Sequence, residues 1–315
     1  MHWGSSSEHE NLRRGKKKNN GSKRSVGDES KSSPAFDASL SVSGFTTAAL
    51  DLKPCILVRT YKGNRNGLVS LLWSLLASGH PHLRAVVVDT DPEPLPGLGE
   101  IIGSINALSG RSWVGVSPRT HAQDVQGKFP SLDTPDFGYV LTDLVMEDIL
   151  RGNDGPGRGV PTTDDPLRAG VPTPSCDTLT VTNGDNMYAQ EFLVRTLNKI
   201  AEGVDAVGTN WVSHYHIDAP RKSNAPYDGN WCASYRRGAY QEMKVKFQCY
   251  CIDLGAAVFR VSTVSKSGLR FCVDRLRSKE KIDRLDLSDG QFFERLGKLA
   301  NVSVAVLHEA LFLHN

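Results

Sequence analysis

Polar residues able to bind metal ions or move protons follow several short apolar runs of the sequence. In chain order these groups are Arg59-Thr60-Tyr61, Asp89-Thr90-Asp91, Asn183-Gly184-Asp185-Asn186, and a late set of Asp286, Asp289, His308 and His314. In open α/β sheets, ligands bind beyond the carboxyl ends of the strands. Carboxylates gathered at such an edge suit a hard divalent cation, which would neutralise a diphosphate there.

The elements expected to position these groups alternate between strands and helices. Residues 55–60 and 83–89 are predicted to be buried strands, joined by a turn at 63–67 and a helix over 68–76. This βαβ unit is typical of a Rossmann-like α/β layer. Further strands are predicted at 179–182, 206–212, 254–261 and 302–307, and helices at 189–200 and 289–299. Residues 137–150 are predicted to form a helix or a strand leading into one.

Charge and composition divide the chain into a tail and a body. Residues 1–50 are rich in Ser, Lys, Asn and Gly and are predicted to be disordered. Residues 1–32 contain eight basic and four acidic residues, which gives them a net charge of +4. Because the whole chain has a net charge of +2, the body carries −2. This balance argues against a nucleic-acid-binding body. Residues 151–176, rich in Gly, Pro, Asp and Thr, are predicted to be an unstructured insertion.

Compartment is left open by the sequence. No run approaches the 18 apolar residues of a membrane span, and the N-terminus has no apolar signal core. The six cysteines are expected to be mostly buried thiols. Asn20-Gly21-Ser22 and Asn301-Val302-Ser303 fit the N-glycosylation pattern, which matters only in a secretory lumen. A soluble location is expected, cytoplasmic or luminal if an anchor lies outside this sequence.

Six segments resemble, in order, those of family 2-like glycosyltransferases with the GT-A fold. They are Ile56–Tyr61, Val86–Asp91, Thr182–Tyr188, Asp253–Arg260, Ser288–Phe293 and Leu311–Asn315. The resemblance covers about residues 54–315 and implies a Rossmann-like GT-A domain over 51–315, with a mostly parallel sheet flanked by helices. It implies transfer of a sugar from a nucleotide-diphosphate-sugar donor to a carbohydrate or other hydroxyl acceptor.

The resemblance also implies roles for individual residues. Asp185 and His314 would bind Mn²⁺ or Mg²⁺, and Asp289 would activate the acceptor hydroxyl as a base, which inverts the anomeric centre. The residues expected to contact the donor are Arg59, Thr60, Tyr61, Asp89, Asp91, Gly184, Asn186, Arg236 and Arg237. Trp231 would stack on a sugar. The Gly184-Asp185-Asn186 motif has one carboxylate where the family motif has two, which leaves a metal fewer charged ligands.

Other interpretations of the same residues stay open. Asp89 and Asp91 also match the nucleophile and acid of haloacid-dehalogenase-type phosphatases, or they are turn formers at a strand end. Asp185 could form an Asx-turn, and Asp289 could serve only to stabilise its helix by interacting with the positive end of the helix dipole. A non-catalytic member of the GT-A fold that only binds nucleotide is a third hypothesis.

Overall fold

The computed structural model describes residues 44–61, 65–92, 95–126, 138–152, 175–213, 241–278 and 285–314, without the side chains of 65, 66, 241 and 286. The chain divides into two units, residues 1–38 and 39–315, and all described residues belong to the second. Most of the predicted tail, nearly all of the insertion, Trp231, Arg236 and Arg237 lie outside the described residues. The short helix α1 (Thr47–Leu50) falls within the predicted tail, so the ordered unit begins earlier than residue 51.

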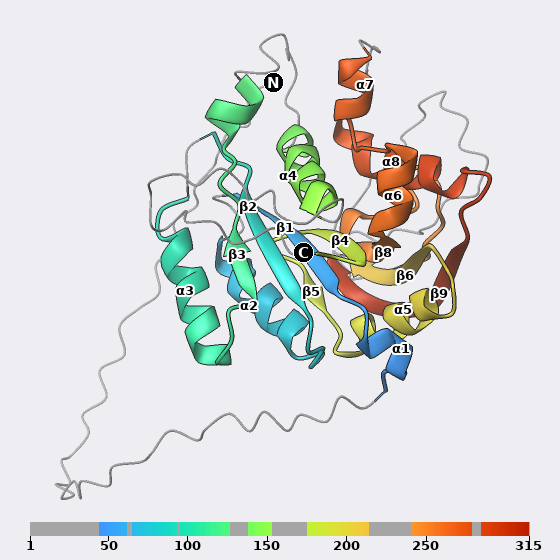
Figure 1. The fold of residues 1–315 in the computed structure, drawn as a ribbon, viewed down its shortest axis with the longest axis horizontal. Coiled ribbons are helices and arrows are strands. Elements are labelled where there is room, and N and C mark those ends of the chain that lie inside the picture. The colour runs from blue at the N-terminus through green and yellow to red at the C-terminus, as the bar shows by residue number, and fades with distance from the viewer. Residues whose placement is uncertain are drawn as a thin grey trace, which may run out of the picture. The chain divides into compact units, whose positions relative to one another are not determined.

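A single mixed sheet forms the centre of the described unit (Figure 1). Its strands follow the order β3-β2-β1-β4-β8-β6-β9-β5, with β7 paired to β6. They are β1 (Pro54–Thr60), β2 (Arg84–Asp89), β3 (Val114–Val116), β4 (Thr178–Asn183), β5 (Met187–Tyr188), β6 (Ala206–Ser213), β7 (Gln241–Met243), β8 (Ala257–Arg260) and β9 (Val304–His314). The four strands β3 to β4 run parallel, β8 is antiparallel to both of its neighbours, and β9 is parallel to β6.

Helices flank this sheet. They are α2 (Arg65–Leu76), α3 (Leu98–Ser109), the π-helix η2 (His121–Gln126), α4 (Tyr139–Gly152), α5 (Glu191–Ala201), α6 (Val261–Ser267), α7 (Val273–Arg277) and α8 (Ser288–Gly297), with 3₁₀ turns η3 (Leu254–Ala256) and η4 (Leu285–Leu287). Figure 1 shows α2 and α3 together beside β1 to β3, and α4 with α6 and α7. The Rossmann-like α/β fold predicted from the sequence is confirmed.

Most predicted elements are present with shifted ends, and residues 137–150 contain the helix α4. The single strand predicted at 254–261 is wrong at its start, because residues 254–256 form η3 before β8 begins. The final strand is longer than predicted and lies between β6 and β5. The predicted turn at 63–67 is wrong at its end, since α2 already includes Gly67. Sequence patterns missed α3 and β3.

The expectation of mostly buried thiols is wrong. Cys55 and Cys176 form a disulfide with a Cα–Cα distance of 5.7 Å, and Cys251 is disulfide-bonded as well. The parallel pairing of Pro54 with Thr178 brings the starts of β1 and β4 together, which places the first pair within bridging distance. Within the described ranges, no helix has both the length and the apolar character to cross a membrane.

Candidate active site

The loop that carries Asp185 is fixed against β1 and α2. Parallel pairing sets Arg59 of β1 beside Asn183 of β4, and the Gly184 amide donates to the Arg59 carbonyl over 2.7 Å. On the other side, a Cβ at Gly67 of α2 would lie 2.5 Å from the Asp185 Cα. Only glycine permits this approach, so α2 holds the Asp185 loop close to Arg59.

The end of β9 reaches the same loop. Met187 and Tyr188 of β5 pair antiparallel with Leu313 and Phe312. Continued by one residue, this register places Asn186 opposite His314 and therefore brings the Asp185 loop to His314. β5 is the last strand in the order of the sheet, and it also contacts α2. The two metal ligands implied by the resemblance, Asp185 and His314, thus come from neighbouring backbone.

Asn186 belongs to the support of this loop. Its side chain is fully buried, and its Nδ2 donates to the Thr182 hydroxyl over 3.0 Å. A buried amide held in this way keeps the turn after β4 in place. The structure therefore favours a positioning role for Asn186, next to Asp185.

Two carboxylates, Asp253 and Asp289, share one part of the site. Asp253 accepts a hydrogen bond from the Gly255 amide over 3.0 Å, and its Oδ2 lies 3.5 Å from the His314 Nδ1. Asp289 lies in the first turn of α8 and accepts a hydrogen bond from the Gly290 amide over 2.7 Å. Burial, and next the negative charge of Asp253, raise the pKa of Asp289 to about 7.

Asp253 is a site residue that sequence reasoning missed. It lies in one of the segments that carry the resemblance, but it received no role. The sequence feature that could have identified Asp253 is a carboxylate that lies between the apolar pairs Cys251-Ile252 and Leu254-Gly255. Its place is fixed by Gly255, where an added Cβ would lie 2.7 Å from both the Phe312 ring and the Tyr188 hydroxyl.

Arg59 supplies buried positive charge among these carboxylates. The residue is 8% exposed, and its Cζ lies 4.4 Å from the centre of the Tyr139 ring. Its positive charge opposes the rise in the pKa of Asp289. Tyr139, the first residue of α4, was also missed, because the 137–150 pattern did not resolve where a helix begins. Stacking on Tyr139 fixes the plane of the guanidinium.

The second strand ends in a loop that its own carboxylate stabilises. The amide and hydroxyl of Thr90 donate to the Thr60 carbonyl over 2.8 and 3.0 Å, which ties β2 to β1. Asp89 accepts from the amide of Asp91 with one oxygen and from that of Leu95 with the other. The turn-forming interpretation of Asp89 is therefore supported. Tyr61, 42% exposed, stands at the end of β1.

The described residues include no group of three or more His, Cys, Asp or Glu side chains placed to hold a metal ion. A divalent cation bound with a nucleotide commonly takes one or two protein ligands and completes its shell with phosphate oxygens and water. Asp185 and His314 stay the predicted ligands of such a cation, and the β5–β9 pairing sets the backbone next to Asp185 beside the end of β9.

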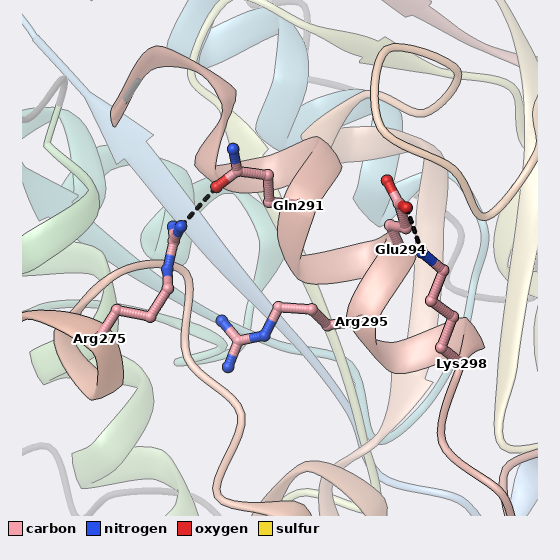
Figure 2. Close-up of a pocket in the computed structure, with 5 residues that line it drawn as sticks. All are labelled: Arg275, Gln291, Glu294, Arg295 and Lys298. Carbon is pink, nitrogen blue, oxygen red and sulfur yellow. Dashed lines mark hydrogen bonds and ion pairs between the residues drawn. The ribbon is translucent and has the colours of Figure 1, made fainter. Parts of the chain in front are cut away.

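A separate hollow is lined by residues of α7 and α8 (Figure 2). It is lined by Arg275, Gln291, Glu294, Arg295 and Lys298. Arg275 donates to Gln291 over 2.6 Å, and Lys298 pairs with Glu294. Gln291 lies about 200° around the helix from Asp289, at 100° per residue. The hollow therefore belongs to a different face of α8 from the carboxylate site.

No protein-family model and no curated protein sequence matches the chain. Among solved structures it is similar to S. aureus TarS 1–349 in complex with UDP-GlcNAc, with 13% identity over 84% of this chain and 58% of that chain, and a TM-score of 0.44. It is also similar to the mannosyltransferase PcManGT from Pyrobaculum calidifontis in complex with GDP-Man and Mn²⁺, with 11% identity, 84% and 56% coverage, and a TM-score of 0.45. The chain spans less than two thirds of either structure. These values assign no activity, so a function has to rest on the site's own residues.

Proposed function

We propose that the chain is a glycosyltransferase that moves a sugar from a nucleotide-diphosphate-sugar to an acceptor hydroxyl with a divalent metal. One observation carries the proposal: Asp289 interacts electrostatically with Asp253, Arg59 and His314, and Asp253 lies 3.5 Å from His314. The backbone of the Asp185 loop lies next to the same residues, because the Gly184 amide donates to the Arg59 carbonyl and β5 pairs with the end of β9. These residues come from β1, the loop after β4, the turn before η3, the start of α8 and the end of β9.

Asp289 is the proposed base. A carboxyl group with a pKa of about 7 is partly ionised at neutral pH and can still take a proton. In the proposed step, Asp289 accepts the proton of the acceptor hydroxyl while the acceptor oxygen bonds to the anomeric carbon. The bond from that carbon to the diphosphate oxygen breaks, and the nucleoside diphosphate leaves with the bonding electrons. Attack opposite the leaving group inverts the anomeric centre.

The remaining groups bind and orient the donor in this proposal. Arg59, held on Tyr139, places positive charge near the diphosphate, and Gly184 lets the backbone approach it. Asp185 and His314 would hold Mn²⁺ or Mg²⁺, which when bound supplies charge neutralisation for the leaving diphosphate. Thr60, Tyr61 and Asp91 remain predicted nucleoside contacts, with Asp89 shaping their loop, and Arg236 and Arg237 remain predicted phosphate contacts.

The phosphatase alternative receives no support from the second strand. A nucleophilic aspartate needs an oxygen that faces the substrate, whereas each oxygen of Asp89 accepts a backbone N–H from the loop that follows. The hypothesis of a non-catalytic nucleotide-binding protein is distinguished from the transferase proposal by the tests of nucleotide binding and catalysis described next.

Nucleotide binding is tested by thermal unfolding of the full chain with UDP or GDP, each with and without Mn²⁺. A ligand at 100 times its Kd stabilises the folded state by about 2.7 kcal/mol, which raises Tm. We expect this rise in the wild type and in Asp51→Asn, an exposed carboxylate at the end of α1, and a reduced rise in Asp185→Asn. Equal shifts in all three proteins, or none with any nucleotide, would overturn the proposal.

Catalysis is tested by screening nucleotide-sugars for slow donor hydrolysis in the absence of an acceptor. The expected result is hydrolysis of one donor by the wild type, and loss of this hydrolysis in Asp289→Asn with its nucleotide-induced Tm shift retained. A Tm shift without hydrolysis or transfer from any donor would make the chain a nucleotide-binding protein and not an enzyme.

A further inference from the structure

An exposed turn between α8 and β9 contains the second of the two N-glycosylation patterns. The turn is closed by the Val302 amide, which donates to the Leu299 carbonyl over 3.2 Å, and Asn301 is exposed within it. Asn301, Val302 and Ser303 form Asn-x-Ser with a residue other than proline in the middle. An acceptor asparagine has to lie on the surface, and this one does.

The disulfides give independent evidence about the compartment in which this turn forms. Cys55 and Cys176 are bridged across 121 residues of sequence, and Cys251 is disulfide-bonded too. Disulfides form and persist in oxidising compartments and are rare in the cytosol. The secretory lumen is both the oxidising compartment in which they form and the one in which Asn-x-Ser patterns are modified.

We propose that the chain matures in an oxidising secretory lumen and that Asn301 carries an N-linked oligosaccharide. The co-reactant is an oligosaccharide on a lipid diphosphate. The Asn301 Nδ2 bonds to the anomeric carbon of the oligosaccharide, and the bond from that carbon to the phosphate oxygen breaks. The lipid diphosphate leaves with the bonding electrons, and the amide gives up one proton to the transferring enzyme.

The fold accommodates a glycan at this position. Asn301 follows the C-terminal end of α8, whereas Asp289 lies at its N-terminal end, and ten helical residues span about 15 Å. A glycan would therefore be attached near the opposite end of α8 from Asp289. In the folded chain the amide and hydroxyl of Ser303 both donate to Asp205 over 2.9 Å. We therefore expect transfer to precede the docking of β9, while Ser303 is still accessible.

The test uses the full chain, with Asn20→Gln to remove the other pattern, secreted from a eukaryotic host behind a cleavable signal peptide. The expected product loses mass on treatment with peptide-N-glycosidase and shows aspartate in place of Asn301 by mass spectrometry. Asn301→Gln is expected to abolish this change. Ser303→Thr keeps the pattern and a hydroxyl near Asp205, so it serves as the matched control and is expected to remain glycosylated.

The compartment is tested by comparing this product with the same chain produced in a reducing cytosol. We expect the secreted chain to contain the Cys55–Cys176 cross-link by peptide mapping and to unfold at a higher temperature than the cytosolic chain with free thiols. An unmodified Asn301 in the folded, secreted chain would overturn the modification site. If the cytosolic chain with free thiols has the same stability and the same rate of donor hydrolysis as the secreted chain, the proposed compartment is wrong.

Discussion

Burial raises the pKa of both Asp143 and Asp289, yet the surroundings of these two carboxylates differ. Asp143 lies in the middle of α4, fully buried, and burial raises its pKa to about 6. Its oxygens accept three backbone N–H groups at 2.7 to 2.9 Å, from Phe271, Cys272 and Val273. Asp289 at the start of α8 has a pKa raised to about 7, and among the described residues only the Gly290 amide donates to it.

The difference separates an anchor from a candidate base. Three amides use the acceptor capacity of Asp143 and join α4 to the turn before α7, so this carboxylate holds structure together. Asp289 keeps acceptor capacity in a site where Asp253, Arg59 and His314 supply charge. A raised pKa therefore does not identify chemistry by itself. A raised pKa indicates a catalytic carboxylate when the group also has unused hydrogen-bonding capacity and charged neighbours.

The largest expected effect is on catalysis in Asp289→Asn. Loss of a general base typically lowers a rate by about 10²- to 10⁴-fold, and asparagine cannot accept the proton. We expect this fall in the kcat of donor hydrolysis or transfer, with nucleotide binding retained. Asp143→Asn provides the comparison: the folded fraction of that variant should keep its kcat. A larger loss of kcat in Asp143→Asn than in Asp289→Asn would reverse the assignment of the two carboxylates.

The same variant has an expected effect on stability. The pKa of Asp289 is about 7 in the folded chain and about 4 when unfolded, so its ionisation costs stability as pH rises from about 4 to 7. Above pH 7 the cost is complete. Asparagine removes it, and we expect Asp289→Asn to melt above the wild type at pH 8 and close to it at pH 4. An equal difference at both pH values would contradict the shifted pKa.

Asp143→Ala is expected to have the largest effect on stability. The substitution leaves three buried amides without their acceptor, and each unsatisfied group costs about 1–3 kcal/mol. Even with the cost of burying the carboxylate removed, we expect a net loss of about 3 kcal/mol, measured by urea unfolding. Asp143→Asn, which keeps one oxygen, should lie between this variant and the wild type. A wild-type midpoint for Asp143→Ala would show that Asp143 is no anchor.

The sequence predicted the strand-end half of this site better than the rest. Arg59 and Asp185 could be predicted from apolar runs that end in polar residues, because parallel strands bring their carboxyl ends to one edge. Asp289 lies at the start of a helix, and its role was predicted only from the resemblance to glycosyltransferases. The roles of Asp253 and Tyr139 were not predicted, since they depend on contacts between segments more than 30 residues apart in the sequence. Asp143 shows the same limit, because a carboxylate inside a helical pattern indicates a solvent-facing position until its tertiary partners are known.

Gly67→Ala tests how tightly the Asp185 loop is held. The added Cβ would meet the Asp185 backbone at 2.5 Å, and overpacking typically costs about 1–3 kcal/mol. We expect a lower Tm and a weaker nucleotide-induced Tm shift than in the wild type. Gly103→Ala in α3 is the matched control, because a Cβ there meets nothing within 4 Å and alanine favours the helix by about 0.5–1 kcal/mol. An unchanged nucleotide shift in Gly67→Ala would show that the loop adapts.

Asp253→Asn is expected to have the smallest effect, on the pH dependence of the rate. The negative charge of Asp253 raises the pKa of Asp289, so its removal lowers that pKa. If Asp289 is the base, the rate rises with pH through its pKa, and the midpoint of this rise should move to lower pH in the variant. Below the wild-type midpoint the variant should be faster by on the order of a few-fold, if the rate at high pH is retained.

Asp253 also lies 3.5 Å from the His314 imidazole, so the substitution can disturb metal binding as well as the base. The two effects differ in their readouts. A loosened His314 weakens the Mn²⁺-dependent Tm shift at every pH, whereas a change at Asp289 moves the midpoint of kcat and leaves that Tm shift intact. If the midpoint of the kcat–pH curve does not move while the Mn²⁺-dependent Tm shift falls, Asp253 positions His314. In that case the charge of Asp253 does not raise the pKa of Asp289, and it does not contribute to the difference between Asp289 and Asp143.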